Sequence, residues 1–119
     1  MFNNLLKFED AIANLEEVLK IEKNEIIRDS AIKRFEICFD LAWKSIKLYA
    51  KRQGLECFSP RGCFKMAVQL KLIENDILWI KMVEDRNIST HVYSEKVADD
   101  VYSRLNEYLI LFKKLKEKL

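Results

Sequence analysis

Apolar residues recur at alternating steps of three and four along most of this chain, and this spacing restricts the fold more than any other feature. Because an α-helix turns once every 3.6 residues, such steps place apolar side chains in one stripe along a helix. Residues that break helices are rare, with two Gly and one Pro in 119 residues. The spacing therefore predicts an all-α protein built from a few long helices, and nothing in it is typical of a β-sheet.

Two apolar stripes predict the first two helices, over residues 4–21 and 25–52. Gly54 is suited to end the second helix, because glycine readily adopts the left-handed backbone conformation that follows many helices. The stripe residues are Leu5, Phe8, Ile12, Leu15 and Leu19 in the first helix, and Ile32, Phe35, Phe39, Ala42, Ile46 and Tyr49 in the second.

Capping residues predict where the next two helices begin. In Ser59-Pro60, the serine can accept a hydrogen bond from a free backbone N–H, and proline suits the first helical turn because it needs no partner there. A short third helix should follow, to about residue 72. Asn75 or Asp76 can cap a fourth helix that continues toward residue 86.

Ser94-Glu95 should start a last helix, whose apolar stripe continues to Leu119. Four substantial helices and one short helix, joined by short connections, predict an antiparallel four-helix up-and-down bundle with one additional short helix. We expect residues 1–119 to form a single domain, because the chain has the length of one domain and carries no internal repeat, low-complexity tract or linker.

Composition excludes several classes of function. The formal net charge of +2 is too small to indicate nucleic-acid binding by itself, so an RNA site would have to be local. Cys38, Cys57 and Cys63 are odd in number and lack paired metal-ligand spacing, and there is one His, so we expect reduced thiols, no metal and no cofactor. Neither a signal peptide nor a membrane-spanning stretch is visible, which predicts a cytoplasmic protein without membrane contact.

The segment whose side chains are best suited to catalysis or binding lies at residues 86–93, where Arg86, His91 and Tyr93 occur close together. Arginine offers a planar fork of donors that matches phosphate oxygens, and histidine can carry a proton near neutral pH. Tyrosine can donate a hydrogen bond or accept a modifying group. The trio therefore suits chemistry on a phosphate.

On an uninterrupted helix, Arg86 and His91 would lie about 140° apart around the axis and would not share a face. We expect the helix to loosen and break between them, because Asn87, Ser89 and Thr90 carry short polar side chains that compete for backbone hydrogen bonds. Such a break would fold His91 back beside Arg86.

Each of these residues also has an ordinary structural alternative. His91 could be a surface or half-buried residue with a routine hydrogen bond, and Arg86 could pair with Glu84 or Asp85. Tyr93 could seal the core at the start of a helix while its hydroxyl meets water. Their joint spacing is what favours a site.

Tryptophans and further cations offer two more alternatives. Trp43 and Trp79 could stack on bases, but each lies on or beside an apolar stripe, which favours core packing. Arg34, Lys44 and Arg61 could contact phosphate, and surface salt bridges explain them equally well.

The pattern R-x4-H-x-Y, formed by Arg86, His91 and Tyr93 with Asn87 directly after the arginine, resembles the signature of the HEPN superfamily. More widely, the chain resembles the nucleotidyltransferase substrate-binding branch of that superfamily. The residues that carry this wider resemblance are Arg34-Phe35-Glu36, Asp40-Leu41-Ala42-Trp43-Lys44, Gly54, Ser59-Pro60-Arg61, Asp76, Trp79 and Arg86-Asn87.

The resemblance implies a helical bundle that forms a homodimer and works with a separate minimal nucleotidyltransferase. The chain lacks the Gly-Ser and spaced aspartates with which a nucleotidyltransferase holds magnesium and a nucleoside triphosphate, so we expect it not to be the transferase itself.

In related HEPN toxins, R-x4-H is a metal-independent ribonuclease site that the partner blocks by adding AMP to the motif tyrosine. The resemblance therefore implies that Arg86 stabilises charge on the reacting phosphate of an RNA and that His91 acts as general acid or base. Tyr93 would be the modification target, and Asn87 a supporting or binding residue. Bulk and negative charge added beside Arg86 would block RNA.

Two other functions stay open. The chain could be a non-catalytic subunit that presents a substrate or nucleotide to the transferase, in which case Arg86, His91 and Tyr93 bind without cutting. It could also be an oligomerisation module whose motif holds an interface together.

Overall fold

The computed structural model describes residues 2–91 and 94–119, with the backbone path alone for Phe2 and His91. Over these residues the chain forms six helices and no strand: α1 (Phe2–Leu19), α2 (Glu25–Arg52), α3 (Pro60–Gln69), α4 (Ile77–His91), α5 (Glu95–Tyr102) and α6 (Leu105–Lys118). The prediction of an all-α protein is confirmed.

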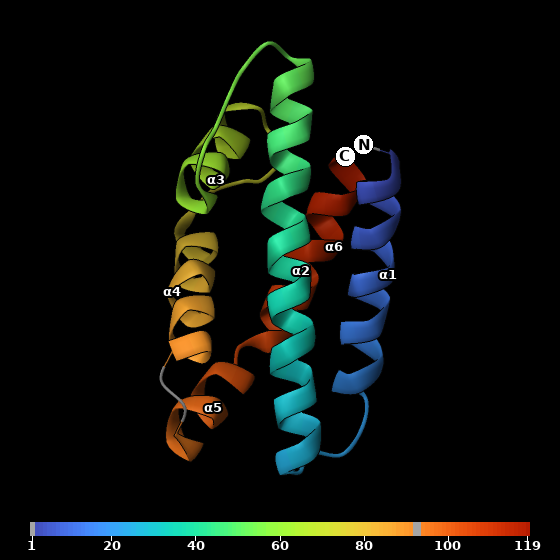
Figure 1. Cartoon of the computed structure of the whole chain (residues 1–119), viewed down its shortest axis with the longest axis vertical. Helices are drawn as coiled ribbons and strands as arrows, with labels where there is room; N and C mark the ends of the chain where they lie inside the picture. Colours follow the sequence, from blue (N-terminus) through green and yellow to red (C-terminus); the bar gives the residue numbers. More distant parts are fainter. Residues whose placement is uncertain (1, 92–93) are drawn as a thin grey trace.

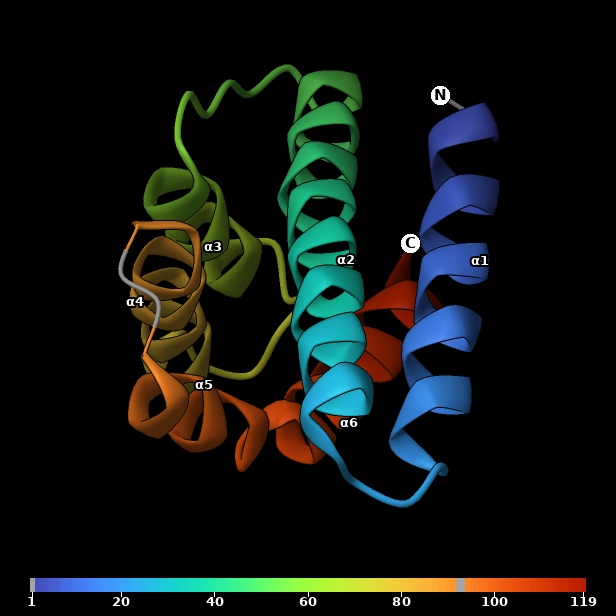
Figure 2. The ribbon, with the colours of Figure 1, turned by 60° about the horizontal axis from the view of Figure 1, so that its bottom comes forward.

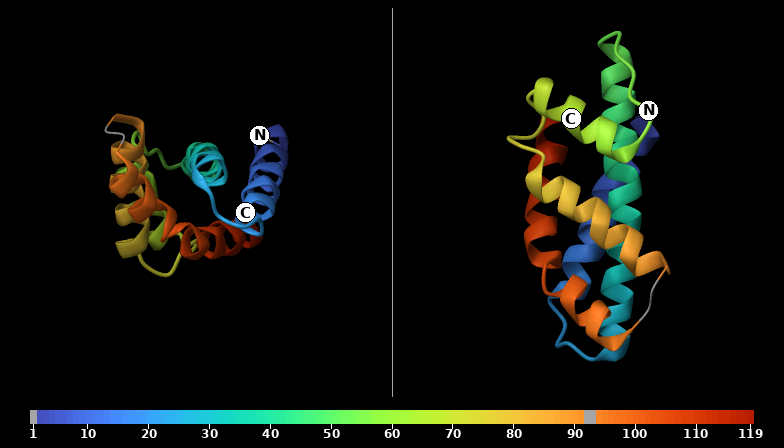
Figure 3. Two further views of the ribbon diagram at one scale, coloured as in Figure 1. Left: turned by 90° about the horizontal axis from the view of Figure 1, so that it is seen from below. Right: turned by 90° about the vertical axis from the view of Figure 1, so that its left-hand side faces the viewer.

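Helix α2 is the central element and contacts all the other helices. Figure 1 shows α1 antiparallel to α2 on one side, with α3 and α4 on the other side. Figure 2 shows α3 and α4 next to each other, and the two views of Figure 3 show α6 returning along the bundle after α5. Helices α3 and α4 therefore lie together on the side of α2 that faces away from α1.

The length of α2 sets the long dimension of the molecule. Its 28 residues correspond to about 42 Å of helix, close to the longest extent of 45 Å. Despite this length, none of the helices in the described part of the chain is long and apolar enough to cross a membrane.

The predicted capping residues begin the helices as expected. Ser59 Oγ and Ser94 Oγ each accept a hydrogen bond from the backbone N–H three residues later, at 3.1 and 3.2 Å. Asn75 Oδ1 accepts one from the backbone N–H two residues later, at 3.2 Å. Gly54 follows α2 with a φ of +77°, a left-handed conformation that costs glycine little.

The last predicted helix is divided into α5 and α6. The chain turns at Ser103 and Arg104, where Ser103 Oγ donates to the backbone oxygen of Asp100 at 2.6 Å. The apolar stripe passes through the turn, from Val101 to Leu105, so its spacing alone predicts one helix. Helices α1 and α3 also end before the predicted ends, at residues 19 and 69.

Cys57 and Cys63 form a disulfide, which corrects the expectation that all the cysteines are reduced. Their Cα atoms lie 5.1 Å apart, because the connection after Gly54 folds back on the start of α3. Cys38 is a free, buried thiol, and this burial raises its pKa to about 12. The disulfide closes a small ring that contains the Ser59-Pro60-Arg61 segment.

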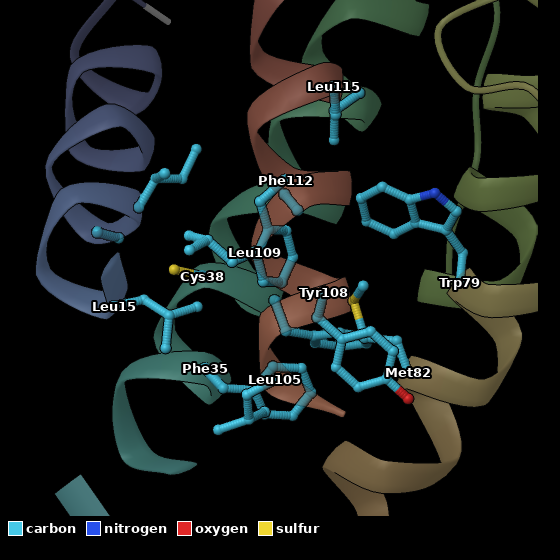
Figure 4. Close-up of a cluster of buried hydrophobic side chains, with 14 of the residues drawn as sticks. Leu15, Phe35, Cys38, Trp79, Met82, Leu105, Tyr108, Leu109, Phe112 and Leu115 are labelled. Carbon is cyan, nitrogen blue, oxygen red and sulfur yellow. The ribbon is translucent and has the colours of Figure 1, made fainter. Parts of the chain in front are cut away.

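Aromatic side chains from α2, α4 and α6 fill the centre of the bundle (Figure 4). The rings of Phe35 and Tyr108 stack with centroids 5.4 Å apart, and Trp79 meets Phe112 edge to face at 5.8 Å. Trp79 is almost fully buried, which confirms the prediction that it belongs to the core. This packing fixes α4 against α6 and so positions the site residues that α4 carries.

Candidate functional site

A cavity of about 480 Å³ opens between α2, the start of α3 and α4. Most of its lining consists of positions that carry the sequence resemblance, although these positions are spread over almost fifty residues of sequence. The lining residues are Phe39, Asp40, Trp43, Lys44, Ser59, Pro60, Arg61, Val83, Arg86 and Asn87. The fold therefore brings the separate motif segments to one place.

Arg86 lies in this cavity and its hydrogen-bonding capacity is only partly used. One terminal nitrogen is 3.4 Å from Asp40 Oδ1, a long contact, and the guanidinium carbon lies 5.8 Å from the ring centroid of Phe39. Its Nε is the one buried side-chain nitrogen or oxygen within the described residues that has no hydrogen-bond partner. A buried donor without an acceptor costs about 1–3 kcal/mol, so an anionic ligand that supplies an acceptor would be favoured.

The preceding residue, Asp85, lies about 100° around the axis of α4 from Arg86, and it is fully buried with its hydrogen bonds satisfied. Arg104 donates two hydrogen bonds of 2.7 Å to its two oxygens, and the Tyr108 hydroxyl donates to Oδ2. Burial, followed by the hydrogen bond to Asp85, raises the pKa of Tyr108, and the Asp85 carboxylate raises the pKa of Arg104. This network fixes the rotation of α4 and thereby holds Arg86 toward the cavity.

Helix α4 continues without interruption from Arg86 to His91, so the prediction that the helix ends between them is wrong. The hydroxyls of Ser89 and Thr90 donate to the backbone oxygen of Arg86 at 3.0 and 3.2 Å, which uses them within the helix. Ser89 Oγ also lies 2.6 Å from Glu36 Oε2 on α2 and ties the end of α4 to the bundle. The two hydroxyls thus bond to the helix's own carbonyl without interrupting it, and the contact to Glu36 holds this end of α4 where we expected a break.

The backbone of α4 places position 91 one turn after Asn87, on the same face. Asn87 lines the cavity, so this face turns toward the cavity wall. Position 91 remains about 140° around the axis from Arg86. The side chain of His91 and the whole of Tyr93 lie outside the described residues, so their predicted roles stay predictions.

Two further cations line the cavity, and a third candidate does not. Lys44 and Arg61 are exposed, and neither forms an ion pair with any carboxylate that the structure describes. Arg34 instead donates to the backbone oxygen of Asn14 at 2.7 Å, which ties α2 to α1. Surface salt bridges therefore do not account for Lys44 and Arg61.

The charges of the cavity favour an anion. Lys44, Arg61 and Arg86 surround it with three positive groups, against the single carboxylate of Asp40. Elsewhere in residues 2–91 and 94–119, no group of three or more His, Cys, Asp and Glu side chains lies close enough to hold a metal ion. The three cations suit recognition of a phosphate.

The two tryptophans differ in position. Trp79 is in the core, whereas Trp43 is half-buried, packs against the core and forms part of the cavity wall. Lys47 Nζ lies 6.0 Å from the ring centroid of Trp43. The apolar stripe predicted core packing for both residues, but only the neighbouring Asp40–Lys44 motif could have indicated the second role of Trp43.

Comparison with known proteins connects this geometry to a family. The chain matches the family described as "Nucleotidyltransferase substrate binding protein like" over residues 3–119. It is also 26% identical, over 85 residues, to a protein from Haemophilus influenzae named "Probable ribonuclease HepT". That alignment covers 67% of this chain and 58% of the relative, so the chain spans little more than half the length of this curated protein.

Solved structures show the same fold. A Thermus thermophilus protein is 35% identical, with 91% of this chain and 94% of that chain covered and a TM-score of 0.85. A Haemophilus influenzae protein, described as a substrate-binding domain of a nucleotidyltransferase, is 21% identical, with 95% and 96% covered and a TM-score of 0.85. A tri-AMPylated Shewanella oneidensis HEPN toxin, solved with an MNT antitoxin, is 22% identical, with 98% and 93% covered and a TM-score of 0.80.

The family match extends over nearly the whole chain, and its motif positions converge on one cation-lined cavity. The sequence resemblance is thereby confirmed. This chain belongs to the family described as nucleotidyltransferase substrate-binding protein-like.

Proposed function

We propose that this chain is the HEPN component of a two-component, toxin–antitoxin-like module and is a metal-independent endoribonuclease. The observation that carries the proposal is Arg86, whose buried Nε has no acceptor in a cavity with further cations. Support comes from the relative named as a probable ribonuclease and from the similarly folded HEPN toxin.

The proposed reaction is attack of a ribose 2′-hydroxyl on the adjacent phosphodiester. A new bond from the 2′-oxygen to phosphorus forms and the bond to the 5′-oxygen breaks, which gives a 2′,3′-cyclic phosphate and a 5′-hydroxyl end. Arg86 stabilises the charge on the phosphoryl oxygens. His91 takes the proton of the 2′-hydroxyl or gives one to the leaving oxygen.

A homodimer would complete the proposed site. Arg86 and position 91 lie about 140° apart on the unbroken α4, while position 91 shares a face with Asn87, which lines the cavity. A second copy whose α4 faces the first would bring two sets of motif residues to one RNA strand. Asn87, at the cavity wall, would hold the backbone of the strand.

We further propose that a separate minimal nucleotidyltransferase inhibits the chain by modifying Tyr93. The tyrosine oxygen would attack the α-phosphorus of ATP, form a tyrosyl-AMP bond and release pyrophosphate. The solved HEPN toxin that shares this fold is AMPylated and bound to an MNT antitoxin. An added AMP would bring negative charge and bulk to the end of α4 and exclude RNA.

Purified protein tests the ribonuclease proposal directly. Arg86→Ala and His91→Ala should each lower RNA cleavage about 10²- to 10³-fold, the usual effect of removing a group that stabilises transition-state charge. Lys7→Ala, an exposed lysine on α1, is the control with the same loss of one cation. Equal cleavage by the unmodified chain and both variants would reject the proposal.

A non-catalytic subunit is the second candidate, and the separation of Arg86 and position 91 on one unbroken helix favours it. In this case, the chain would present a substrate to the nucleotidyltransferase without cutting RNA. It predicts a stable complex, no cleavage and no arrest of growth when the chain is expressed alone. Mass spectrometry of the chain expressed with and without the transferase would show whether Tyr93 gains AMP, and a ribonuclease assay on both forms would separate the two candidates.

A further inference from the structure

We propose that the cavity binds one unpaired nucleotide of a single-stranded RNA, next to the phosphodiester held by Arg86. The base would lie against Trp43, and the phosphate of this nucleotide would lie between Lys44 and Arg61. The inference deepens the proposed function and rests on it for the identity of the polymer. It gives a role to Trp43, Lys44 and Arg61, which line the same cavity as Arg86 and take no part in the proposed reaction.

The cavity has the dimensions of a small-ligand site. Its volume of about 480 Å³ lies within the usual range for such sites, roughly 300–1,000 Å³. Residues of α2, of α4 and of the disulfide-closed turn at the start of α3 line it, and we expect an unpaired base to enter it more readily than a paired one. Proteins that read unpaired RNA use this kind of arrangement, with splayed bases on aromatic side chains.

Trp43 can serve as the stacking surface for the base. It is held in place because it packs against the core, yet it is only half-buried and lines the cavity. A rigid aromatic side chain stacks on a base with little loss of conformational entropy. Lys47 Nζ lies over the same ring, 6.0 Å from its centroid, and adds positive charge there.

Lys44 and Arg61 can bind the phosphate. Both are exposed at the cavity wall, and neither has an ion-pair partner among the residues that the structure describes. Arg61 is in the first turn of α3, where the free backbone N–H groups of a helix add partial positive charge. The Cys57–Cys63 disulfide encloses this turn and fixes its position opposite α4.

Tryptophan fluorescence provides a direct measurement, because the chain contains two tryptophans and one of them is in the core. In a Trp79→Phe variant, emission would come from Trp43 alone. Titration with a 2′-O-methyl tetranucleotide, which lacks the reacting hydroxyl, should quench this emission until it saturates. A blunt RNA duplex of the same sequence should quench it weakly or not at all. Saturating quenching by the duplex alone, or no quenching by the tetranucleotide, would overturn the inference.

Binding of a labelled tetranucleotide to the otherwise unchanged chain gives a second test that avoids a core substitution. Trp43→Leu, which keeps an apolar side chain against the core, should weaken binding roughly fivefold to hundredfold. Lys44→Ala and Arg61→Ala should each reduce the slope of log affinity against log salt by about 0.7. Lys7→Ala is the control of equal charge change, and effects no larger than those of this control would contradict the inference.

Failure of the proposed function looks different from failure of this inference. If RNA is not cut but the tetranucleotide still quenches Trp43, the nucleotide site stands and the ribonuclease proposal falls. If RNA is cut in an Arg86-dependent manner while Trp43→Leu, Lys44→Ala and Arg61→Ala leave KM unchanged, the ribonuclease stands and the nucleotide site is wrong.

Discussion

Asp85 and Arg86 are neighbours on α4, and they meet very different surroundings. Asp85 is fully buried and accepts hydrogen bonds from Arg104 and Tyr108, so both of its oxygens are satisfied. Arg86 lies on the face of the helix that lines the cavity, where Asp40 is 3.4 Å away and the buried Nε of Arg86 has no acceptor. The first site is complete without a ligand, whereas the second is not.

On this one helix, Asp85 serves the stability of the fold and Arg86 serves the proposed function. A buried carboxylate held by a two-pronged arginine rigidifies the bundle, because removing either partner leaves an unpaired group in the interior. An arginine with a weak partner contributes little to stability and keeps donors for a phosphate. We therefore expect substitutions at Asp85 to affect stability first, and substitutions at Arg86 to affect function first.

Asp85→Asn should have the largest effect. Loss of the carboxylate charge weakens the hydrogen bonds from Arg104 and Tyr108, and because Arg104 is partly exposed and keeps Asp100 as a partner, we expect a cost of about 2–3 kcal/mol. The free energy of unfolding from urea titration measures this loss. Asp40→Asn, at the partly exposed and poorly paired carboxylate, is the control and should cost less than about 1 kcal/mol. Equal losses of unfolding free energy in Asp85→Asn and Asp40→Asn would contradict the contrast between the buried network and the cavity.

Cys57→Ser should affect the cavity wall without affecting the Asp85 network. The disulfide closes a short ring, for which constraint of the unfolded chain predicts about 2 kcal/mol of stabilisation. We expect a loss of that size, together with weaker binding of the tetranucleotide. The unmodified chain with and without a thiol reductant provides the matched comparison. A Cys57→Ser variant that melts and binds like the oxidised parent would contradict the assigned disulfide.

Arg86→Lys sharpens the comparison, because it keeps the charge and removes the planar fork of donors. RNA cleavage should fall about tenfold or more, since a lysine cannot make the two-pronged contact with phosphate. The melting temperature should stay close to that of the unmodified chain. A variant that melts much earlier but cuts RNA normally would show that Arg86 serves the fold.

Acid should slightly weaken the ion pairs that Asp99 and Asp100 on α5 form with Lys23, Arg28 and Arg104. Hydrogen bonds from Lys23 and Arg28 lower the pKa of Asp99, and the hydrogen bond from Arg104 lowers the pKa of Asp100. A lowered carboxyl pKa stabilises the fold above the ordinary value near 4, and this contribution is lost as the pH falls through the folded-state pKa. The melting temperature should therefore decline below about pH 4. Asp100→Asn should flatten that decline, and added salt should reduce it; an unchanged slope would contradict this account.

Local signals in the sequence predicted the helical class and most of the helix starts. Ser59-Pro60, Asn75 and Ser94 act within two or three residues of their partners, so their meaning is visible in sequence. The turn at Ser103 and Arg104 was not predictable in the same way. The apolar stripe continues through it, while the side chain of Arg104 pairs with Asp85 on another helix.

The candidate site, too, combines features that the sequence reveals with features that depend on contacts between distant helices. The family resemblance singled out Arg86 and Asn87, and the structure places both at the cavity. The Cys57–Cys63 disulfide was missed, because an odd number of cysteines and an expected cytoplasmic location both argue against one. The unused Nε of Arg86 also depends on how α2 and α4 pack, which no spacing in the sequence reveals.

The most direct test compares the Nε–H resonances of Arg86 and Arg104 by NMR during titration with the 2′-O-methyl tetranucleotide. An Arg86→Lys sample would assign the first resonance. We predict that the Arg86 Nε–H signal shifts and exchanges more slowly with water as the oligonucleotide binds, while the Arg104 signal, already bound to Asp85, stays in place. Binding that leaves the Arg86 signal unmoved would contradict the claim that this guanidinium is held ready for a phosphate.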